Sequence, residues 1–328
     1  MILETKALTK RFGAFTAVEG LDLSVAEGDI FGFLGPNGAG KTTTIRMLLR
    51  LIPRTSGEIR IFGRELDREF LAIAQEIGAI VEEPAFYPYL SGRENLKVFG
   101  RLSGGVSAAR VDECLDRVGL LKRGGDKVRV YSQGMRQRLG IAQALLAKPR
   151  LLFLDEPTNG LDPPGIEEMR KLLTGLAREE KVTVLVSSHL LNEVEVLCNR
   201  VAILNRGRLV VQGEVAALLE TDTVRLELGF DGPAEPVIAV LGALGHGDVA
   251  RGKDPQRVVI AAPRRETAAL ARALVERGIP LTALIPRRPT LEEYFRERLA
   301  IPVEGNASSV VPVPVPDPVQ GASLRGTP

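Results

Sequence analysis

Residues 35–42, with the sequence GPNGAGKT, constrain the fold of this 328-residue chain more than any other stretch. They fit the pattern G-x-x-x-x-G-K-[ST], in which glycines allow backbone N–H groups to surround phosphate oxygens. An apolar run at 29–34 precedes the pattern and predicts a buried strand, and residues 43–49 after it predict a helix. A Gly-rich turn can precede a helix by chance, but the lysine, the threonine and the strand together favour a nucleotide-phosphate site.

This phosphate loop predicts particular contacts with a nucleotide. Lys41 can reach the β- and γ-phosphates, and the hydroxyl of Thr42 can bind Mg²⁺. The helix that follows adds partial positive charge at its N-terminus, which favours a bound phosphate. The residues expected to bind nucleotide in this loop are Gly35, Pro36, Asn37, Gly38, Ala39, Gly40, Lys41, Thr42 and Thr43.

Composition limits the partners that such a chain can have. The formal net charge is +2, which gives no electrostatic reason to expect a nucleic-acid partner. No apolar run approaches the ~20 residues that a membrane-spanning helix needs, and no secretory signal is visible at the N-terminus. Cys114 and Cys198 suit a reducing cytoplasm and provide no metal-binding spacing. We therefore expect any role at a membrane to depend on a partner.

The order of sequence patterns predicts an α/β core with an insertion. Apolar and polar residues alternate over the first 30 residues, which is typical of half-buried antiparallel strands. Residues 85–147 are mostly helical in pattern, and a capping box, Ser91 to Glu94, begins one of these helices. Apolar runs typical of parallel strands return at 151–154 and 182–186. We expect one nucleotide-binding domain over residues 1–220, with a helical insert at about 85–147.

The remainder of the chain predicts a second, smaller unit and a tail. Strand patterns at 223–228 and 257–261 and helix patterns at 266–277 and 290–299 favour a small α+β domain over residues 222–300. His246 lies among glycines and is expected in a turn rather than in a catalytic group. Residues 301–328 are rich in valine, proline and small residues and are expected to be disordered, a Pro-rich docking peptide being the alternative.

Truncation after Ala300 is expected to leave any hydrolysis of the bound nucleotide and the melting temperature nearly unchanged. The tail lacks the composition of a packed core and offers no residue that could join the phosphate site. Steady-state assays of nucleotide hydrolysis and thermal melts of the full and truncated chains measure this. A large loss of either property would mean that the tail docks on the nucleotide-binding domain.

Three apolar runs end in polar groups at their carboxyl ends. The first leads into the phosphate loop, the second ends in Asp155 and Glu156, and the third ends in His189 after two serines. Ligands of open parallel sheets bind beyond the carboxyl ends of the strands, so these groups should converge on the γ-phosphate. Asp155 is suited to hold Mg²⁺, and Glu156 could polarise a water. A solvated strand end would explain the acidic pair alone, but not its position after a phosphate loop.

A second helix N-terminus suitable for phosphate is predicted at residues 131–135. Ser132 is expected to cap a helix whose apolar stripe includes Leu139 and Ala142. Gly134 leaves the backbone open to close approach by an anion. Taken alone, the stretch would be an ordinary capped helix.

Together these motifs resemble the nucleotide-binding cassette of ABC transporters over about residues 1–220. Residues 35–42 are similar to its Walker A loop, 151–156 to Walker B, and 131–135 to its signature motif, usually written L-S-G-G-Q. Asp162 in the sequence GLD matches the D-loop, and His189 matches the switch histidine. Phe12 matches the aromatic residue that stacks on adenine. The resemblance implies the fold of a P-loop NTPase: a parallel-sheet core, an antiparallel N-terminal sheet and a helical insert.

The chain departs from the family pattern in two places. Tyr131 and Gln133 replace the more common leucine and glycine of the signature, while Ser132 and Gly134 are kept. Glu82 stands where the family places the Q-loop glutamine, with Glu83 possible if the register shifts by one. A carboxylate beside Mg²⁺ adds negative charge. We expect Glu82 beside the metal together with Thr42 and Asp155, the alternative being a solvated loop acid.

The resemblance also implies a function and partners. Two copies would enclose two ATP molecules, with Mg²⁺, between the loop of one copy and Ser132–Gly134 of the other. Residues 81–88 and 289–295 resemble bacitracin- and multidrug-resistance exporters, whose multi-span membrane subunits are separate chains. The chain is then expected in the cytoplasm, peripheral on the inner face of the membrane, and to meet its partner near residues 85–100. One alternative is a soluble ABC-type ATPase acting on DNA or ribosomes, but such proteins usually have paired cassettes or long coiled coils. The other alternative is a P-loop kinase or GTPase, which would not explain His189.

Overall fold

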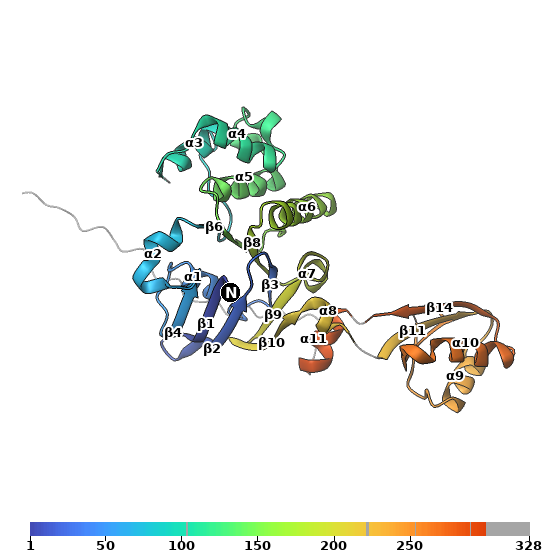
Figure 1. Ribbon diagram of the computed structural model, residues 1–328. Coiled ribbons are helices and arrows are strands. Elements are labelled where there is room, and N and C mark those ends of the chain that lie inside the picture. The colour runs from blue at the N-terminus through green and yellow to red at the C-terminus, as the bar shows by residue number, and fades with distance from the viewer. Residues whose placement is uncertain (103, 221–222, 253, 289, 300–328) are drawn as a thin grey trace, which may run out of the picture.

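A computed structural model describes residues 1–299 except 103, 221, 222, 253 and 289. The tail expected at 301–328 lies outside the described residues. The described part of the chain forms two units, each with its own sheet and core (Figure 1). None of the described helices is long and apolar enough to cross a membrane.

A six-stranded sheet forms the centre of the first unit, in the order β10-β9-β3-β8-β7-β6. All neighbouring strands run parallel except β10, which pairs antiparallel with β9. The strands predicted from the three apolar runs are therefore present and adjacent in the middle of this sheet. The bounds are β3 Ile30–Leu34, β6 Ile77–Ile80, β7 Leu151–Asp155, β8 Thr183–Ser188, β9 Arg200–Asn205 and β10 Arg208–Glu214.

Alternate residues of the central strands fill two separate cores. Phe31, Phe33 and Phe153 are fully buried on one face, against an antiparallel sheet and helix α1. Leu152 and Leu154 point to the other face, where the helical insert and α6 cover them. The antiparallel sheet has the order β2-β1-β4-β5, in which β1 and β2 are the antiparallel strands predicted for the first 30 residues. Its elements and the helices are β1 Leu3–Phe12, β2 Phe15–Val25, β4 Ser56–Ile61, β5 Arg64–Glu65, α1 Lys41–Leu48, α2 Leu66–Ala74 and α6 Pro163–Glu179.

The helical insert lies between β6 and β7 and forms a lobe of its own (Figure 1). Its helices are α3 Gly92–Leu102, α4 Ala108–Arg117 and α5 Gln133–Leu145. The predicted capping box begins α3: the Ser91 N–H donates to Glu94 Oε2 at 2.7 Å, and the Glu94 N–H donates to Ser91 Oγ at 3.1 Å. Leu139 and Ala142 of α5 are fully buried, as the apolar stripe predicted.

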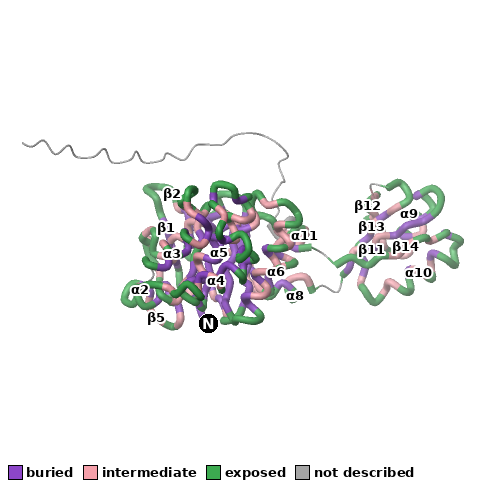
Figure 2. Tube along the Cα trace, turned by 90° about the horizontal axis from the view of Figure 1, so that it is seen from above, coloured by how far each residue is buried: buried purple, intermediate pink, exposed green. Residues whose placement is uncertain are grey.

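The second unit is an antiparallel sheet with helices on one face. Its strand order is β12-β13-β11-β14, and helices α9 and α10 supply much of its apolar core. Figure 2 shows the buried residues of this unit gathered apart from those of the first. The bounds are β11 Thr223–Phe230, β12 Val249–Arg251, β13 Arg257–Pro263, β14 Leu281–Arg287, α9 Ala234–Ala243 and α10 Thr267–Glu276. His246 lies in the loop after α9, as expected.

The described apolar side chains of the last helix, α11 (Leu291–Leu299), pack on the first unit rather than on this sheet. We expected it within the C-terminal unit, but Leu291 is fully buried in the core of the first unit, and Phe295 packs against that core. The helix contacts α7 (Leu191–Leu197) and α8 (Val215–Leu218). Helices α9 and α10 fill the apolar core of the C-terminal sheet without α11. The apolar side of α11 is buried on the first unit instead.

Candidate nucleotide-binding site

The phosphate loop joins the end of β3 to the start of α1, as predicted. Gly38 and Gly40 have φ values of 79° and 103°, a left-handed region that favours glycine. A Cβ on Gly40 would also lie 2.7 Å from the carbonyl oxygen of Ala17. Both the backbone conformation and the close approach of β2 therefore require glycine at position 40.

The ammonium group of Lys41 lies buried against the phosphate loop. The residue is only 6% exposed, and its Nζ donates to the carbonyl oxygens of Gly35 at 2.7 Å and Pro36 at 3.3 Å. Its third neighbour is Glu156 Oε1, at 3.6 Å. A buried ammonium is costly unless it is paired, so the loop places a cation where phosphate oxygens can replace these weak partners.

Asp155 and Thr42 bring hard oxygen atoms together at the end of β7. Thr42 Oγ1 donates to Asp155 Oδ2 at 2.9 Å, and Ser187 Oγ donates to the other carboxylate oxygen. Asp155 is only 7% exposed and is held in place by these two hydroxyl groups. A hydroxyl and a carboxylate next to a phosphate loop form a donor set that fits Mg²⁺, which binds few protein oxygens and keeps the rest for water and phosphate.

Glu156 and His189 meet beside Lys41. His189 Nδ1 lies 2.7 Å from Glu156 Oε2, and the Glu156 N–H donates to Ser187 Oγ at 3.0 Å. Glu156 has a φ of 50°, a left-handed conformation that is unusual for a glutamate and turns the chain away from β7. The ends of β3, β7 and β8 thus bring Lys41, Glu156 and His189 together, as the strand order requires.

Ser187 is a site residue that the sequence reasoning missed. It is fully buried at the end of β8, directly opposite Asp155 in the strand register. Its hydroxyl contacts both Asp155 and the backbone of Glu156. A polar residue inside an otherwise apolar strand was the available signal, since a buried hydroxyl needs a hydrogen-bonding partner.

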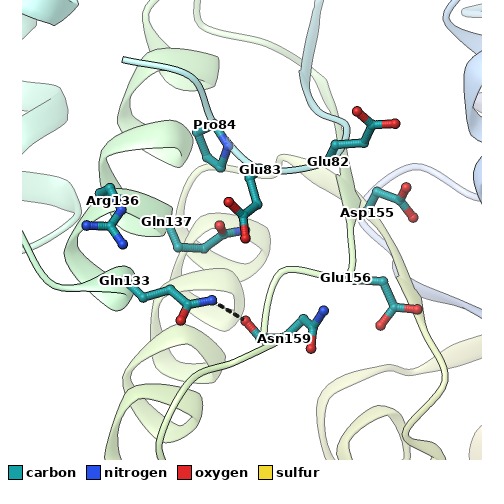
Figure 3. Close-up of a pocket in the computed structure, with 9 residues that line it drawn as sticks. All are labelled: Glu82, Glu83, Pro84, Gln133, Arg136, Gln137, Asp155, Glu156 and Asn159. Carbon is teal, nitrogen blue, oxygen red and sulfur yellow. Dashed lines mark hydrogen bonds between the residues drawn. The ribbon is translucent and has the colours of Figure 1, made fainter. Parts of the chain in front are cut away.

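The N-terminus of α5 faces the same region from the helical lobe. Ser132 caps the helix, since its Oγ accepts from the Met135 N–H at 3.2 Å. Gln133 Nε2 donates to the carbonyl oxygen of Asn159 at 3.2 Å, across a pocket between α5 and the end of β7 (Figure 3). The residues that line this pocket are Glu82, Glu83, Pro84, Gln133, Arg136, Gln137, Asp155, Glu156 and Asn159.

Phe12 and Asp162 lie outside the cluster around Lys41. Phe12 ends β1 and is 51% exposed, with Lys10 Nζ 4.8 Å from its ring centroid. Asp162 caps α6, where its Oδ1 accepts from the Gly165 N–H at 3.2 Å. Within the described residues, no hydrogen bond or ion pair joins either residue to Lys41 or Glu156.

Comparison with known proteins shows the family to which this chain belongs. Residues 18–159 match the protein family described as "ABC transporter". The bacitracin transport ATP-binding protein BcrA of Bacillus licheniformis is 42% identical over 296 residues, which cover 90% of this chain and 96% of that protein. The chain belongs to the ATP-binding proteins of ABC transporters.

Two further relatives support this assignment. An uncharacterised ABC transporter ATP-binding protein of Bacillus subtilis, YhcH, is 51% identical over 209 residues, covering 64% of this chain and 68% of that protein. The solved cassette MJ0796, a dimer in a post-hydrolysis state bound to ADP and Pi, matches with a TM-score of 0.59 and 27% identity over 65% of this chain and 98% of that chain. The predicted family, fold class and ATP hydrolase activity coupled to transport are thereby confirmed.

The structure of this ABC cassette accommodates its unusual signature tyrosine. Tyr131 is 3% exposed and packs in the core of the helical lobe, and its hydroxyl donates to the carbonyl oxygen of Arg123 at 2.8 Å. Burial raises the pKa of the Tyr131 phenol, so the hydroxyl remains a donor. The tyrosine thus replaces leucine without leaving a polar group unpaired.

Glu82 has an ion-pair partner within the cassette. Glu82 has a φ of 68° and forms an ion pair with Arg46 of α1 while remaining largely exposed. Glu82 and Glu83 both line the pocket that contains Asp155 and Glu156 (Figure 3). The negative charge of Glu82 is therefore partly balanced by Arg46.

Proposed function

We propose that this chain is the ATPase subunit of an exporter for a drug, a peptide antibiotic or a lipid-like substrate. The observation that carries the proposal is the 42% identity to a bacitracin transport protein over nearly the whole length of both chains. The substrate-transporting partner is a separate multi-span membrane subunit. The chain accordingly works in the cytoplasm, bound to the inner face of the membrane, with no nucleic acid as partner.

ATP binding involves residues from several elements. Gly35–Thr43 hold the phosphates through backbone N–H groups and Lys41, and Phe12 stacks on the adenine. Thr42 and Asp155 would hold Mg²⁺, and Glu82 lines the pocket that contains Asp155. The ion, when bound, would supply positive charge that neutralises the phosphate oxygens.

Hydrolysis depends on the contacts around Glu156. The γ-phosphate draws Lys41 away from the Glu156 carboxylate, so that Glu156 can accept a proton from the attacking water. With a proton on each ring nitrogen, His189 holds the Glu156 carboxylate through Nδ1 and donates to the γ-phosphate through Nε2. Buried Ser187 fixes the backbone of Glu156 during this step.

Two cassettes enclose each ATP. Ser132 and Gly134 at the start of α5 of one copy complete the site of the other, and Asp162 contacts the partner cassette across the interface. The γ-phosphate then bridges two positive helix ends, and its release by hydrolysis separates the copies. This movement resets the membrane subunit, which meets the cassette at the helical insert near residues 85–100.

Purification with a membrane subunit tests this function. The full chain, purified from detergent-solubilised membranes of the cells that produce it, should bring a multi-span membrane protein with it and hydrolyse ATP faster in that complex than alone. Recovery with ribosomes or DNA, and none with the membrane protein, would contradict the proposal.

Glu82→Gln is expected to leave ATP affinity similar while changing how far the membrane subunit stimulates hydrolysis. The side chain is exposed and its ion pair with Arg46 lies outside the phosphate loop, so the substitution removes charge without disturbing the site. ATPase rates with and without the membrane subunit measure the effect. Unchanged stimulation would mean that Glu82 is simply a solvated loop acid.

A further inference from the structure

Helix α7 connects the hydrolytic site to the C-terminal part of the chain. It begins two residues after His189 and has only seven residues, with no side-chain cap at its N-terminus. A helix of this length has little stability of its own, so packing fixes its position. Val194 anchors it in the core, while two carboxylates of the helix, Glu193 and Glu195, bind partners from different parts of the chain.

The first of these partners belongs to the hydrolytic site. Glu193 Oε2 accepts from Thr158 Oγ1 at 2.5 Å, and Thr158 lies two residues after Glu156. Helix α7 is thus joined to His189 through the chain and to the Glu156 segment through a hydrogen bond. Its position therefore influences the 2.7 Å contact between His189 and Glu156.

The second partner is α11, about a hundred residues later. The Leu291 N–H donates to Glu195 Oε2 at 2.8 Å, which places a carboxylate at the N-terminus of α11 where it is electrostatically favourable. Leu291 is fully buried in the cassette core, and Phe295 packs against that core. Burial of a leucine side chain is among the larger favourable contributions that a single residue makes, so this contact is a stable attachment.

The same helix is attached to the C-terminal sheet. Glu293 Oε1 accepts from Arg225 Nη1 of β11 at 2.7 Å, and Glu293 Oε2 accepts from the Thr290 N–H at 3.0 Å. The Glu293 N–H in turn donates to Thr290 Oγ1 at 3.2 Å, which completes a capping box. Figure 1 shows α11 close to α8, away from the sheet of the C-terminal unit to which β11 belongs.

We propose that α11 is a strap through which the C-terminal unit holds α7, and thereby His189, in its hydrolytic position. Glu195 and Leu291 are then positioning residues for hydrolysis. The inference rests on the roles of Glu156 and His189 in the proposed function. Small misplacements of a reacting group are costly in rate, about 10²-fold for 1 Å, whereas the phosphate loop has no part in these contacts. Loss of the strap therefore lowers kcat and spares ATP binding.

Glu195→Ala in the full chain is the first test. It removes one hydrogen bond of the half-buried contact, so the protein should still fold, and kcat should fall about 3- to 10-fold with an unchanged KM for ATP. Glu195→Gln keeps an acceptor oxygen and should restore most of the rate. Leu291→Ala should have the larger effect, and Val196→Ala, which truncates an exposed side chain of the same helix, should have none.

Combining Glu195→Ala with His189→Ala distinguishes a failure of the strap from a failure of the proposed role of His189. If the strap acts through His189, Glu195→Ala should lower kcat little further once His189 is absent. An equal loss of kcat in both backgrounds, or a raised KM with normal kcat, would overturn the strap while leaving the role of His189 intact. A normal kcat for His189→Ala alone would instead remove the proposed role of His189, and the strap with it.

Discussion

Glu156→Gln is expected to lower the rate of ATP hydrolysis by about 10²- to 10⁴-fold, the usual contribution of a general base. The change is nearly isosteric, and Asp155 keeps its bonds to Thr42 and Ser187, so ATP should still bind. Phosphate release and equilibrium nucleotide binding measure the two properties. Glu168→Gln, the same change at an exposed acid on α6, serves as the matched control. A wild-type rate for Glu156→Gln would show that its catalytic assignment is wrong.

The same variant should also accumulate as a dimer. With hydrolysis slowed, the γ-phosphate continues to bridge Lys41 of one copy and the Ser132 helix end of the other. Light scattering should then show a dimer with Mg-ATP and a monomer with ADP. A monomer with ATP bound would mean that the isolated chain does not form the enclosed pair.

Ser132→Arg is expected to abolish both the ATP-bound dimer and hydrolysis, although the phosphate loop of the variant is intact. The exposed start of α5 would carry a long charged side chain at the surface where the second copy must approach. The variant also loses a helix cap worth about 0.5–2 kcal/mol, which needs a control. Ser107→Arg removes the equivalent cap of α4, where Ser107 Oγ accepts from the Arg110 N–H at 3.1 Å.

Light scattering and ATPase assays of these two variants distinguish the two effects. Ser107→Arg should lose a comparable amount of stability and keep its activity and its dimer. Equal losses of activity in both variants would mean that damage to the helical lobe, rather than a blocked interface, explains Ser132→Arg.

Local signals explain why much of the fold and site could be predicted from the sequence. The strand of residues 30–34, the phosphate loop and the Ser132 cap each depend on residues that are near one another in the chain. The convergence of Asp155 and His189 followed from one general property of parallel sheets, that their carboxyl ends share an edge.

Contacts between distant residues explain what could not be predicted. Ser187 binds Asp155 across two strands, and Glu82 is paired with Arg46 of a different element. The position of α11 depends on Leu291 meeting Glu195, a contact that no periodicity in either helix encodes. Such pairings arise from tertiary packing, which overrides local sequence preference.

Mixing two inactive variants tests the composite site most directly. Lys41→Ala should bind ATP poorly, because it removes the buried cation of the phosphate loop, and Ser132→Ala should be nearly inactive, because it removes the hydroxyl that completes the partner copy's site without placing a bulky side chain in the interface. In a mixed dimer one site carries both defects and the other carries neither, since each site takes Lys41 from one copy and Ser132 from the other. The ATPase rate of the mixture should lie well above the sum of the rates of the two variants measured separately. A mixture no more active than that sum would contradict a site shared between two copies.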